Sequence, residues 1–301
     1  MKKIMDMIKY DWNTLTNSME YKIIHRYTYI GATYAQLFAL IAYIVPLFIT
    51  FGHFVPDFLD IVEPLNQSRS HQMIILAEYF VDNEKYFYFI ALHVNVCFFI
   101  FQITLMSTTS TYISYIQHVC GMFQIASYRI EHALDSYEKG NLISERRCVT
   151  CARLISAIDI HRRAIMFFEF MADTFIILYF CLLFLGVASL TINVYCAVIT
   201  EGIIENFISI LSVLIHLFYF FLVNYAGQKV LDHSNIFLSK TYNSKWHMMP
   251  LHVQKLILFI MQRSTKDCML LVGGIYVASL EGLATAMSAS LSYFMVIYST
   301  R

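Results

Sequence analysis

The stretch CMLLVGGIYVASLEGLATAMSASLSYFMVIYST, residues 268–300, decides how the rest of the chain is interpreted. It is long enough to cross a bilayer as a helix, which takes about 20 mostly apolar residues. Small and hydroxyl side chains interrupt it, which is typical either of a spanning helix packed tightly against others or of one that lines a water path. We expect one continuous spanning helix from Cys268 to Thr300, with Glu281 near its middle.

The composition of the whole chain is that of an integral membrane protein. Of its 301 residues, 58% are hydrophobic and only 14% are charged, whereas a soluble domain has about 25% charged residues. The net charge is zero, so the total charge indicates no partner. The first 26 residues do not read as a secretory signal, so insertion is expected to depend on the spanning helices.

Five apolar segments predict an all-α membrane protein, a helical bundle with five transmembrane helices in a single membrane domain over residues 1–301. The second segment is longer than one crossing needs, so we expect it to project beyond the membrane. Two charged segments with helical periodicity are expected to form cytosolic anchor segments, 127–163 and 227–267. The expected spans are approximately 27–51, 86–124, 164–188, 206–226 and 268–300.

The distribution of Lys and Arg predicts the orientation of these spans. Five lie in residues 1–26, seven in 127–163 and six in 227–267, against three on the opposite side. Because cytosolic loops carry the excess of basic residues, we expect a cytosolic N-terminus and an extracellular C-terminus. The sequon Asn66-Gln-Ser68 lies in a loop expected outside, which makes Asn66 the candidate glycosylation site.

No motif of a known enzyme class is present, because the chain has no Gly-rich phosphate loop, nucleophile elbow or zinc-protease helix. Cys148-x-x-Cys151 has His132 and His161 nearby, but a zinc site needs four ligands at characteristic spacings. We therefore expect free thiols, no metal, no cofactor and no enzymatic activity. Membrane lipid is an expected partner and nucleic acid is not.

Aromatic side chains crowd the second and third spans. Most are expected to face lipid or pack between helices, and some to line an apolar pocket in the outer half of the bundle. Such a pocket suits small, volatile, hydrophobic ligands, because burial of apolar surface supplies most of their affinity.

Five short motifs lie between Tyr112 and Arg301, and as a set they resemble the insect odorant receptor family. One of them departs from the family pattern, with Phe123 in place of the usual Leu. The motifs are His118-Val-Cys-Gly-Met-Phe123, Asn224-Tyr-Ala-Gly227, Tyr242-Asn-Ser-Lys-Trp246 followed by Pro250, Leu256–Arg263, and Ser292-Tyr-Phe-Met-Val296.

This resemblance implies seven spans with a cytosolic N-terminus and an extracellular C-terminus. The expected orientation agrees, and the number of spans does not. Two further spans would precede Met1, so we expect a receptor that lacks its first two helices, either through an incomplete gene model or as a truncated relative.

The resemblance also implies a ligand-gated cation channel subunit. Such a subunit acts with a shared co-receptor in a hetero-tetramer, in the plasma membrane of sensory neuron dendrites, and transduces olfactory signals. The last helix would line the pore, with Val296 as the gate residue and Ser299 and Thr300 at polar positions near it. From depth and side-chain type, the expected ligand contacts are Tyr43, Phe89, His93 and Ser209.

Four alternatives are weighed against this interpretation. A gustatory-type receptor would share the fold, and a truncated relative would not conduct. A G-protein-coupled receptor needs an extracellular N-terminus, which the basic residues oppose. A transporter more often shows paired repeats with broken helices, which the sequence lacks. The sequence does not identify the odorant.

Overall fold

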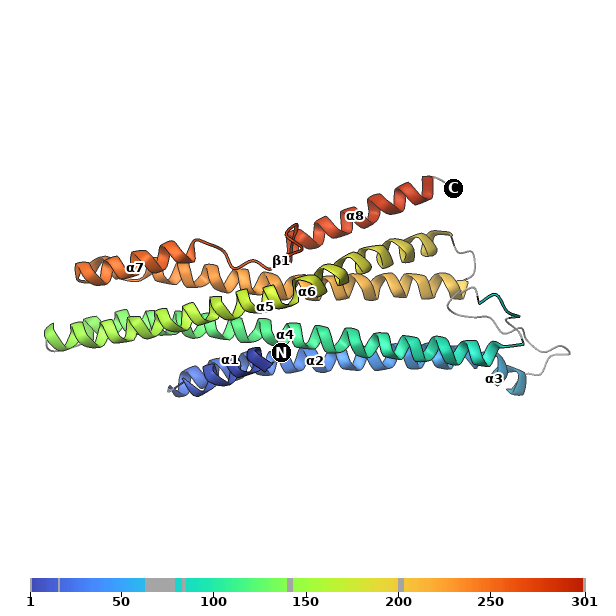
Figure 1. The fold of residues 1–301 in the computed structure, drawn as a ribbon, viewed down its shortest axis with the longest axis horizontal. Helices are drawn as coiled ribbons and strands as arrows, with labels where there is room; N and C mark the ends of the chain where they lie inside the picture. The colour runs from blue at the N-terminus through green and yellow to red at the C-terminus, as the bar shows by residue number, and fades with distance from the viewer. Residues whose placement is uncertain are drawn as a thin grey trace. The chain divides into compact units, whose positions relative to one another are not determined.

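The computed structural model describes residues 2–15, 17–62, 79–82, 85–139, 143–199 and 203–299, and nearly all of them are helical (Figure 1). Asn66 and Thr300 lie outside the described residues. A two-stranded antiparallel sheet, β1 (Leu271–Val272) and β2 (Tyr276–Val277), separates the last two helices. The helices are α1 (Lys2–Asn13), α2 (Ser18–His53), α3 (Val55–Val62), α4 (Phe87–Lys139), α5 (Ile143–Ile199), α6 (Ile203–Asn243), the 3-10 turn η1 (Trp246–Met248), α7 (Leu251–Ser264) and α8 (Leu280–Ser299).

Among the described helices, four are long and apolar enough to cross a membrane. They overlap four of the five segments expected to span. The remaining segment, 27–51, lies inside α2, and residues 27–56 contain no Asp, Glu, Lys or Arg. The chain is therefore a multi-pass membrane protein, and the expected α-helical membrane fold is confirmed. The four helical segments are Phe87–Ala133, Thr150–Ile199, Ser209–Asn243 and Leu280–Ser299.

The long helices extend well beyond any bilayer. With 53 residues in α4 and 57 in α5, a rise of about 1.5 Å per residue gives lengths of roughly 80 and 85 Å. A hydrocarbon core is about 30 Å thick. The described residues of the charged segment 127–163 are thus helical continuations of α4 and α5, whereas segment 227–267 continues α6 to Asn243 and then forms η1 and α7. The helix over the expected third span likewise continues past Ala188 to Ile199.

The chain forms two compact units, Met1–Ile30 with Ile113–Arg301, and Gly31–Tyr112. Helices α2 and α4 each run through both. The larger unit has a continuous apolar core contributed by α4, α5 and α6, in which the ring of His161 stacks on Phe237 at 4.1 Å between centroids. Its fully buried side chains include Ile116, Met122, Phe123, Ile130, Leu154, Ile160, Phe167, Met171 and Phe237.

Polar contacts join the helices of the smaller unit, and many of its described apolar side chains are exposed. Thr50 donates a hydrogen bond of 2.8 Å to Oδ1 of Asn95, whose Nδ2 donates to the carbonyl of Ala91 at 2.8 Å. Phe54 stacks on Tyr88 with 6.3 Å between centroids. Exposed apolar side chains together with hydrogen-bonded buried polar groups are what a lipid environment favours.

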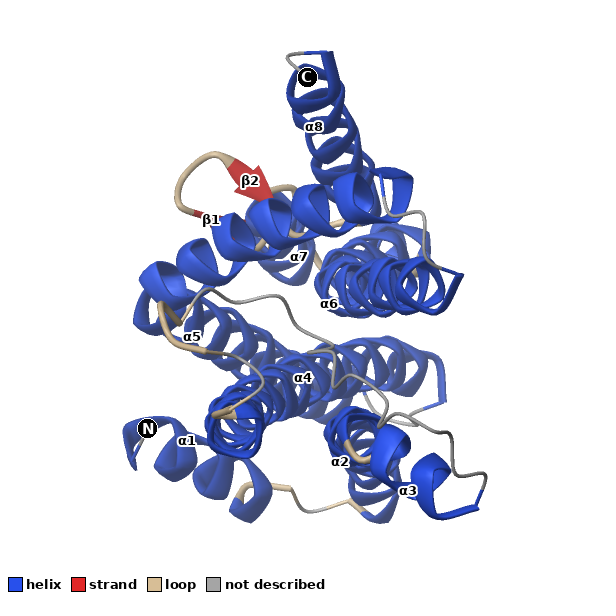
Figure 2. Cartoon of the chain, turned by 90° about the vertical axis from the view of Figure 1, so that its right-hand side faces the viewer, coloured by secondary structure: helices blue, strands red, loops and turns tan. Residues whose placement is uncertain are grey.

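The last helix begins at Leu280, so the expectation of a continuous helix from Cys268 is wrong in its first part (Figure 2). Gly273 and Gly274 have φ of 61° and 74°, a left-handed conformation that glycine adopts without steric cost. They turn β1 back onto β2. Glu281 accordingly lies in the first turn of α8, where the helix dipole favours a carboxylate, and not near the middle of the helix.

Candidate functional site

Helix α8 contacts the rest of the chain along one narrow stripe of small residues. Gly282, Ala286 and Ser290 are buried, and their spacing of four residues places them on one face. Leu283, Ala289 and Phe294 are half-buried, and the other side chains of the helix are exposed, including Leu291 at 55% and Val296 at 60%. The small stripe allows close backbone approach, and most of the remaining surface of the helix is exposed.

A second stripe on α8 carries hydroxyl groups and lies next to the buried one. Thr285, Ser288, Ser292, Val296 and Ser299 follow one another at spacings of three or four residues, which places them on one face. All five are exposed. Val296, the expected gate residue, is therefore in line with the hydroxyl groups and with Ser299.

These hydroxyl groups are satisfied within the helix. Thr285, Ser288 and Ser292 donate to the backbone carbonyl four residues earlier at 3.1, 2.9 and 2.9 Å, and Ser299 donates to the carbonyl of Val296 at 2.9 Å. Each oxygen keeps acceptor capacity toward its surroundings. The stripe can thus face either water or an apolar partner without an unsatisfied donor.

The hairpin before α8 is held on α6 by side-chain hydrogen bonds. The Tyr276 hydroxyl donates to Oδ1 of Asn224 at 2.7 Å, and Nδ2 of Asn224 donates to the carbonyl of Phe220 at 2.9 Å. Oε1 of Gln228 accepts from the N–H of Leu280 at 3.3 Å. Burial raises the pKa of Tyr276 to about 12, so the phenol stays protonated and keeps donating.

Two further contacts position the same junction. A Cβ at Gly227 on α6 would collide with the carbonyl oxygen of Ala278, so glycine lets the two backbones meet. The Ser279 hydroxyl accepts from the N–H of Gly282 at 3.0 Å, as an N-cap does. Cys268, at the start of the hairpin, is 6% exposed, and burial raises its pKa to about 11. The start of α8 is therefore fixed to α6.

A buried ion cluster joins α1 to α4 and α5. Asp11 is 4% exposed and accepts from Nη1 of Arg163 at 2.8 Å. Its other oxygen lies 3.1 Å from Nε2 of His118. Arg163 also donates to Thr14 at 2.9 Å and lies 3.1 Å from Asp159. Since a buried charge is tolerated only when paired, this cluster fixes α1 against the bundle.

A second ion pair joins α2 to α4 and α5. Arg129 donates to both carboxylate oxygens of Glu20, at 2.6 and 2.8 Å. The same guanidinium donates to the hydroxyl of Ser156 at 2.8 Å and to its carbonyl at 3.2 Å. Such two-point pairing gives a fixed geometry as well as attraction. Neither ion cluster was predicted from the sequence.

Three of the four expected ligand contacts belong to the Gly31–Tyr112 unit, and Ser209 on α6 belongs to the larger unit. Tyr43 on α2 is 52% exposed and Phe89 on α4 is 75% exposed. Within the described part of the smaller unit, no hydrogen bond joins Tyr43, Phe89 and His93 to one another.

His93 instead has partners that the sequence did not indicate. Its Nδ1 lies 2.9 Å from the Tyr79 hydroxyl, and its Nε2 lies 3.6 Å from the sulfur of Cys97. The rings of Tyr79 and His93 also meet edge to face, with 5.8 Å between centroids. This trio offers a polar contact next to exposed aromatic surface.

Cys151 faces α7, with its sulfur 3.5 Å from Nε2 of His252. His132 and His161 do not join it in a metal-binding group. Across the described ranges, no cluster of three or more His, Cys, Asp or Glu side chains has the arrangement of a metal site.

Comparison with known proteins places this architecture in a family. The 7tm Odorant receptor family profile matches residues 1–291. The olfactory receptor OR5 of the insect Machilis hrabei shares the fold, with a TM-score of 0.71 in its complex with eugenol and 0.66 in a second structure. Both are 16% identical, over 93% of this chain and 70% of theirs. Curated protein sequences give no significant match. The resemblance seen in the C-terminal motifs is thus confirmed, and the chain belongs to the 7tm odorant receptor family.

Proposed function

We propose that this olfactory receptor is an odorant-gated cation channel subunit that acts with a shared co-receptor in a hetero-tetramer. Its site of action would be the plasma membrane of sensory neuron dendrites, with a cytosolic N-terminus and an extracellular C-terminus. The observation that carries the proposal is α8, which rests on its own chain through a small-residue stripe and leaves a hydroxyl-bearing face exposed. A helix of this kind is completed by other subunits around a water path.

The pore-lining face is the stripe from Thr285 to Ser299. Its hydroxyl oxygens provide acceptors for hydrated cations, and Val296 interrupts them with an apolar side chain that is 60% exposed. A ring of such side chains closes a pore by excluding water. Ser299 and Thr300 would line the polar pore entrance next to this gate.

The hairpin would transmit ligand binding to the gate. Because Tyr276, Gln228 and Gly227 fix the start of α8 to α6, a displacement of α6 moves the base of the pore helix. The polar parts of α6 and α7 would anchor the subunits to one another in the cytosol.

The ligand would be a small, volatile, hydrophobic molecule. OR5 was solved with eugenol, and the exposed aromatic side chains of this chain suit a ligand of that size. Tyr43, Phe89, His93 and Ser209 would contact it. The His93–Tyr79 pair would supply the polar contact.

The test is to express the chain in oocytes with the co-receptor, with each subunit alone as controls, and to apply a panel of volatile odorants. We expect an odorant-evoked cation current that requires both chains and that differs in odorant preference from the co-receptor alone. A complex that reaches the surface and gives no odorant-dependent current would contradict the proposal and favour the non-conducting relative.

A further inference from the structure

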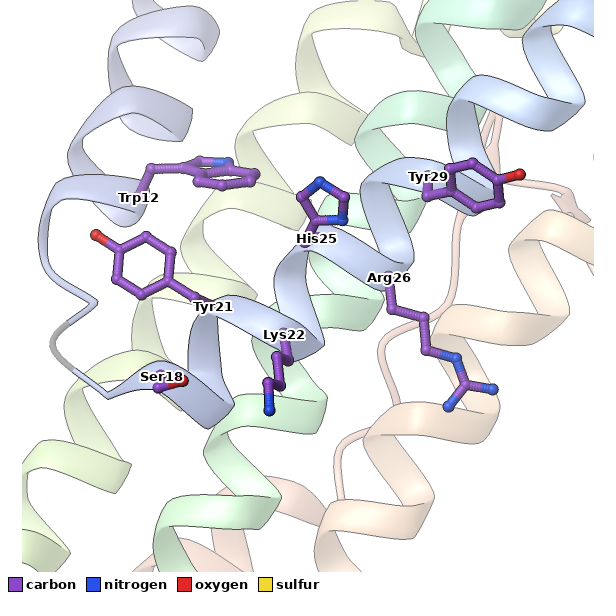
Figure 3. Close-up of a pocket in the computed structure, with 7 residues that line it drawn as sticks. All are labelled: Trp12, Ser18, Tyr21, Lys22, His25, Arg26 and Tyr29. Carbon is purple, nitrogen blue, oxygen red and sulfur yellow. The ribbon is translucent and has the colours of Figure 1, made fainter.

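An open groove of about 510 Å³ lies where α1 meets the start of α2 (Figure 3). Trp12 of α1 forms one wall. The other walls are a single face of α2, because residues three and four apart lie on the same side of a helix. Figure 3 shows Lys22 and Arg26 extending in the same direction, with the rings of Trp12, Tyr21 and His25 above them. Tyr29 closes the far end.

The groove face of α2 points outward because the residues on the opposite face of the helix are buried or bonded to the rest of the bundle. Glu20 is paired with Arg129, and Ile24 is 1% exposed. The hydroxyl of Tyr27 lies 2.6 Å from Nε2 of His233. With these three positions fixed inward, the groove residues stay exposed.

The groove carries positive charge that the described part of the chain does not neutralise. Lys22 and Arg26 are exposed and one turn apart, and neither forms an ion pair with a described residue. His25 lies between them. The neighbouring carboxylates are already engaged, Glu20 by Arg129 and Asp11 by Arg163. The groove is therefore complementary to an anion.

The position of the groove along α2 indicates where that anion lies. Arg26 is the last charged residue before the uncharged stretch 27–56, so the groove sits at the boundary between water and hydrocarbon. Its rings are those enriched at this boundary, where an apolar body and a polar edge are both satisfied. Trp12 and Tyr21 meet edge to face with 6.5 Å between centroids.

We propose that this groove binds the phosphate headgroup of an anionic phospholipid in the cytosolic leaflet. The leaflet assignment rests on the topology of the proposed function. Arg26 supplies the planar donor pair that matches phosphate oxygens, and Lys22 adds a second cation. The aromatic wall lies against the glycerol and the first acyl carbons. The cytosolic leaflet carries the anionic lipids that such basic sites attract.

The experiment uses Trp12 as the reporter. The chain has two tryptophans, so Trp246→Phe leaves Trp12 as the single tryptophan, whose emission is read by selective excitation of the indole. The full chain is placed in phosphatidylcholine nanodiscs that contain equal fractions of brominated phosphatidylserine or brominated phosphatidylcholine. We expect stronger quenching by the brominated phosphatidylserine. K22Q/R26Q should lower this preference about 25-fold in relative affinity, at about fivefold per cation.

The control variant removes two exposed cations from the same expected side of the membrane, K255Q/K266Q, and should keep the preference. K22R/R26K preserves the charge and should also keep it. Equal quenching by both lipids, or equal loss in K22Q/R26Q and K255Q/K266Q, would overturn the site. Relief of quenching by excess inorganic phosphate would assign the groove to a free anion instead.

This readout needs no ion current. Equal quenching by both lipids together with normal odorant currents would contradict the lipid site and would support the proposed channel function. Selective quenching by phosphatidylserine without odorant currents would support the lipid site and contradict the channel function.

Discussion

Replacing Glu20 by Gln is expected to lower the free energy of unfolding by about 3 kcal/mol. Glu20 is 4% exposed and accepts two of the hydrogen bonds that Arg129 donates. The variant keeps the side-chain shape and leaves the guanidinium without its counterion. Breaking a buried ion pair costs about 3–5 kcal/mol. The lower end applies because Arg129 retains its bonds to Ser156. Unfolding in mixed micelles titrated with SDS measures the change.

The control is Glu169→Gln. It is also paired with an arginine, Arg263 at 3.2 Å, but the side chains are 56% and 41% exposed, so the expected loss is about 0–1 kcal/mol. Combining Glu20→Gln with Arg129→Met removes both charges and should recover part of the loss, because no unpaired charge remains. Equal losses in Glu20→Gln and Glu169→Gln would show that burial does not strengthen the Glu20–Arg129 pair.

Two further predictions concern the junction of α6 with α8. Gly227→Ala places a Cβ against the backbone of Ala278, and we expect the free energy of unfolding to fall by about 1–3 kcal/mol. Size-exclusion chromatography should then show a lower yield of folded protein. An unchanged yield would contradict the contact. Cys268, with its pKa raised to about 11, should react with maleimide at pH 8 about two-hundredfold more slowly than a thiol at the usual pKa of about 8.5. Its contribution to stability is present below about pH 8.5 and is lost as the pH rises through 11. Labelling of single-cysteine variants with Cys268 or Cys151 checks this, and equal rates would contradict it.

The helical membrane fold was predictable because its signals are local. Uncharged stretches such as 27–56 indicate spans by length and composition alone. The start of α8 was misjudged because apolar residues before Gly273 read as part of the same span. The Gly273-Gly274 pair was the signal that could have indicated a turn, since adjacent glycines mark such breaks. Its effect depends on the strand pairing of Leu271 with Val277.

The supporting side chains were not predictable, because their roles depend on partners far along the chain. Asp11 meets Arg163, and Glu20 meets Arg129, only once α1, α2, α4 and α5 have packed. In the sequence these are ordinary charged residues near helix ends. His93 was selected for its depth, and its contact with Tyr79 likewise arises from the fold. The stripe containing Val296 could have been predicted from the sequence, because helical spacing alone places Val296 on the same face as the hydroxyl residues.

The central claim is that the hydroxyl stripe of α8 lines an odorant-gated pore with Val296 as its gate. The most direct test records odorant-evoked currents from Val296→Ala with the co-receptor, beside Leu291→Ala as a control of similar exposure on another face. We expect Val296→Ala to shift the odorant threshold or the reversal potential, because a smaller apolar side chain weakens exclusion of water. Leu291→Ala should leave both unchanged. Unaltered threshold and reversal potential in Val296→Ala, at normal surface expression, would contradict the pore assignment.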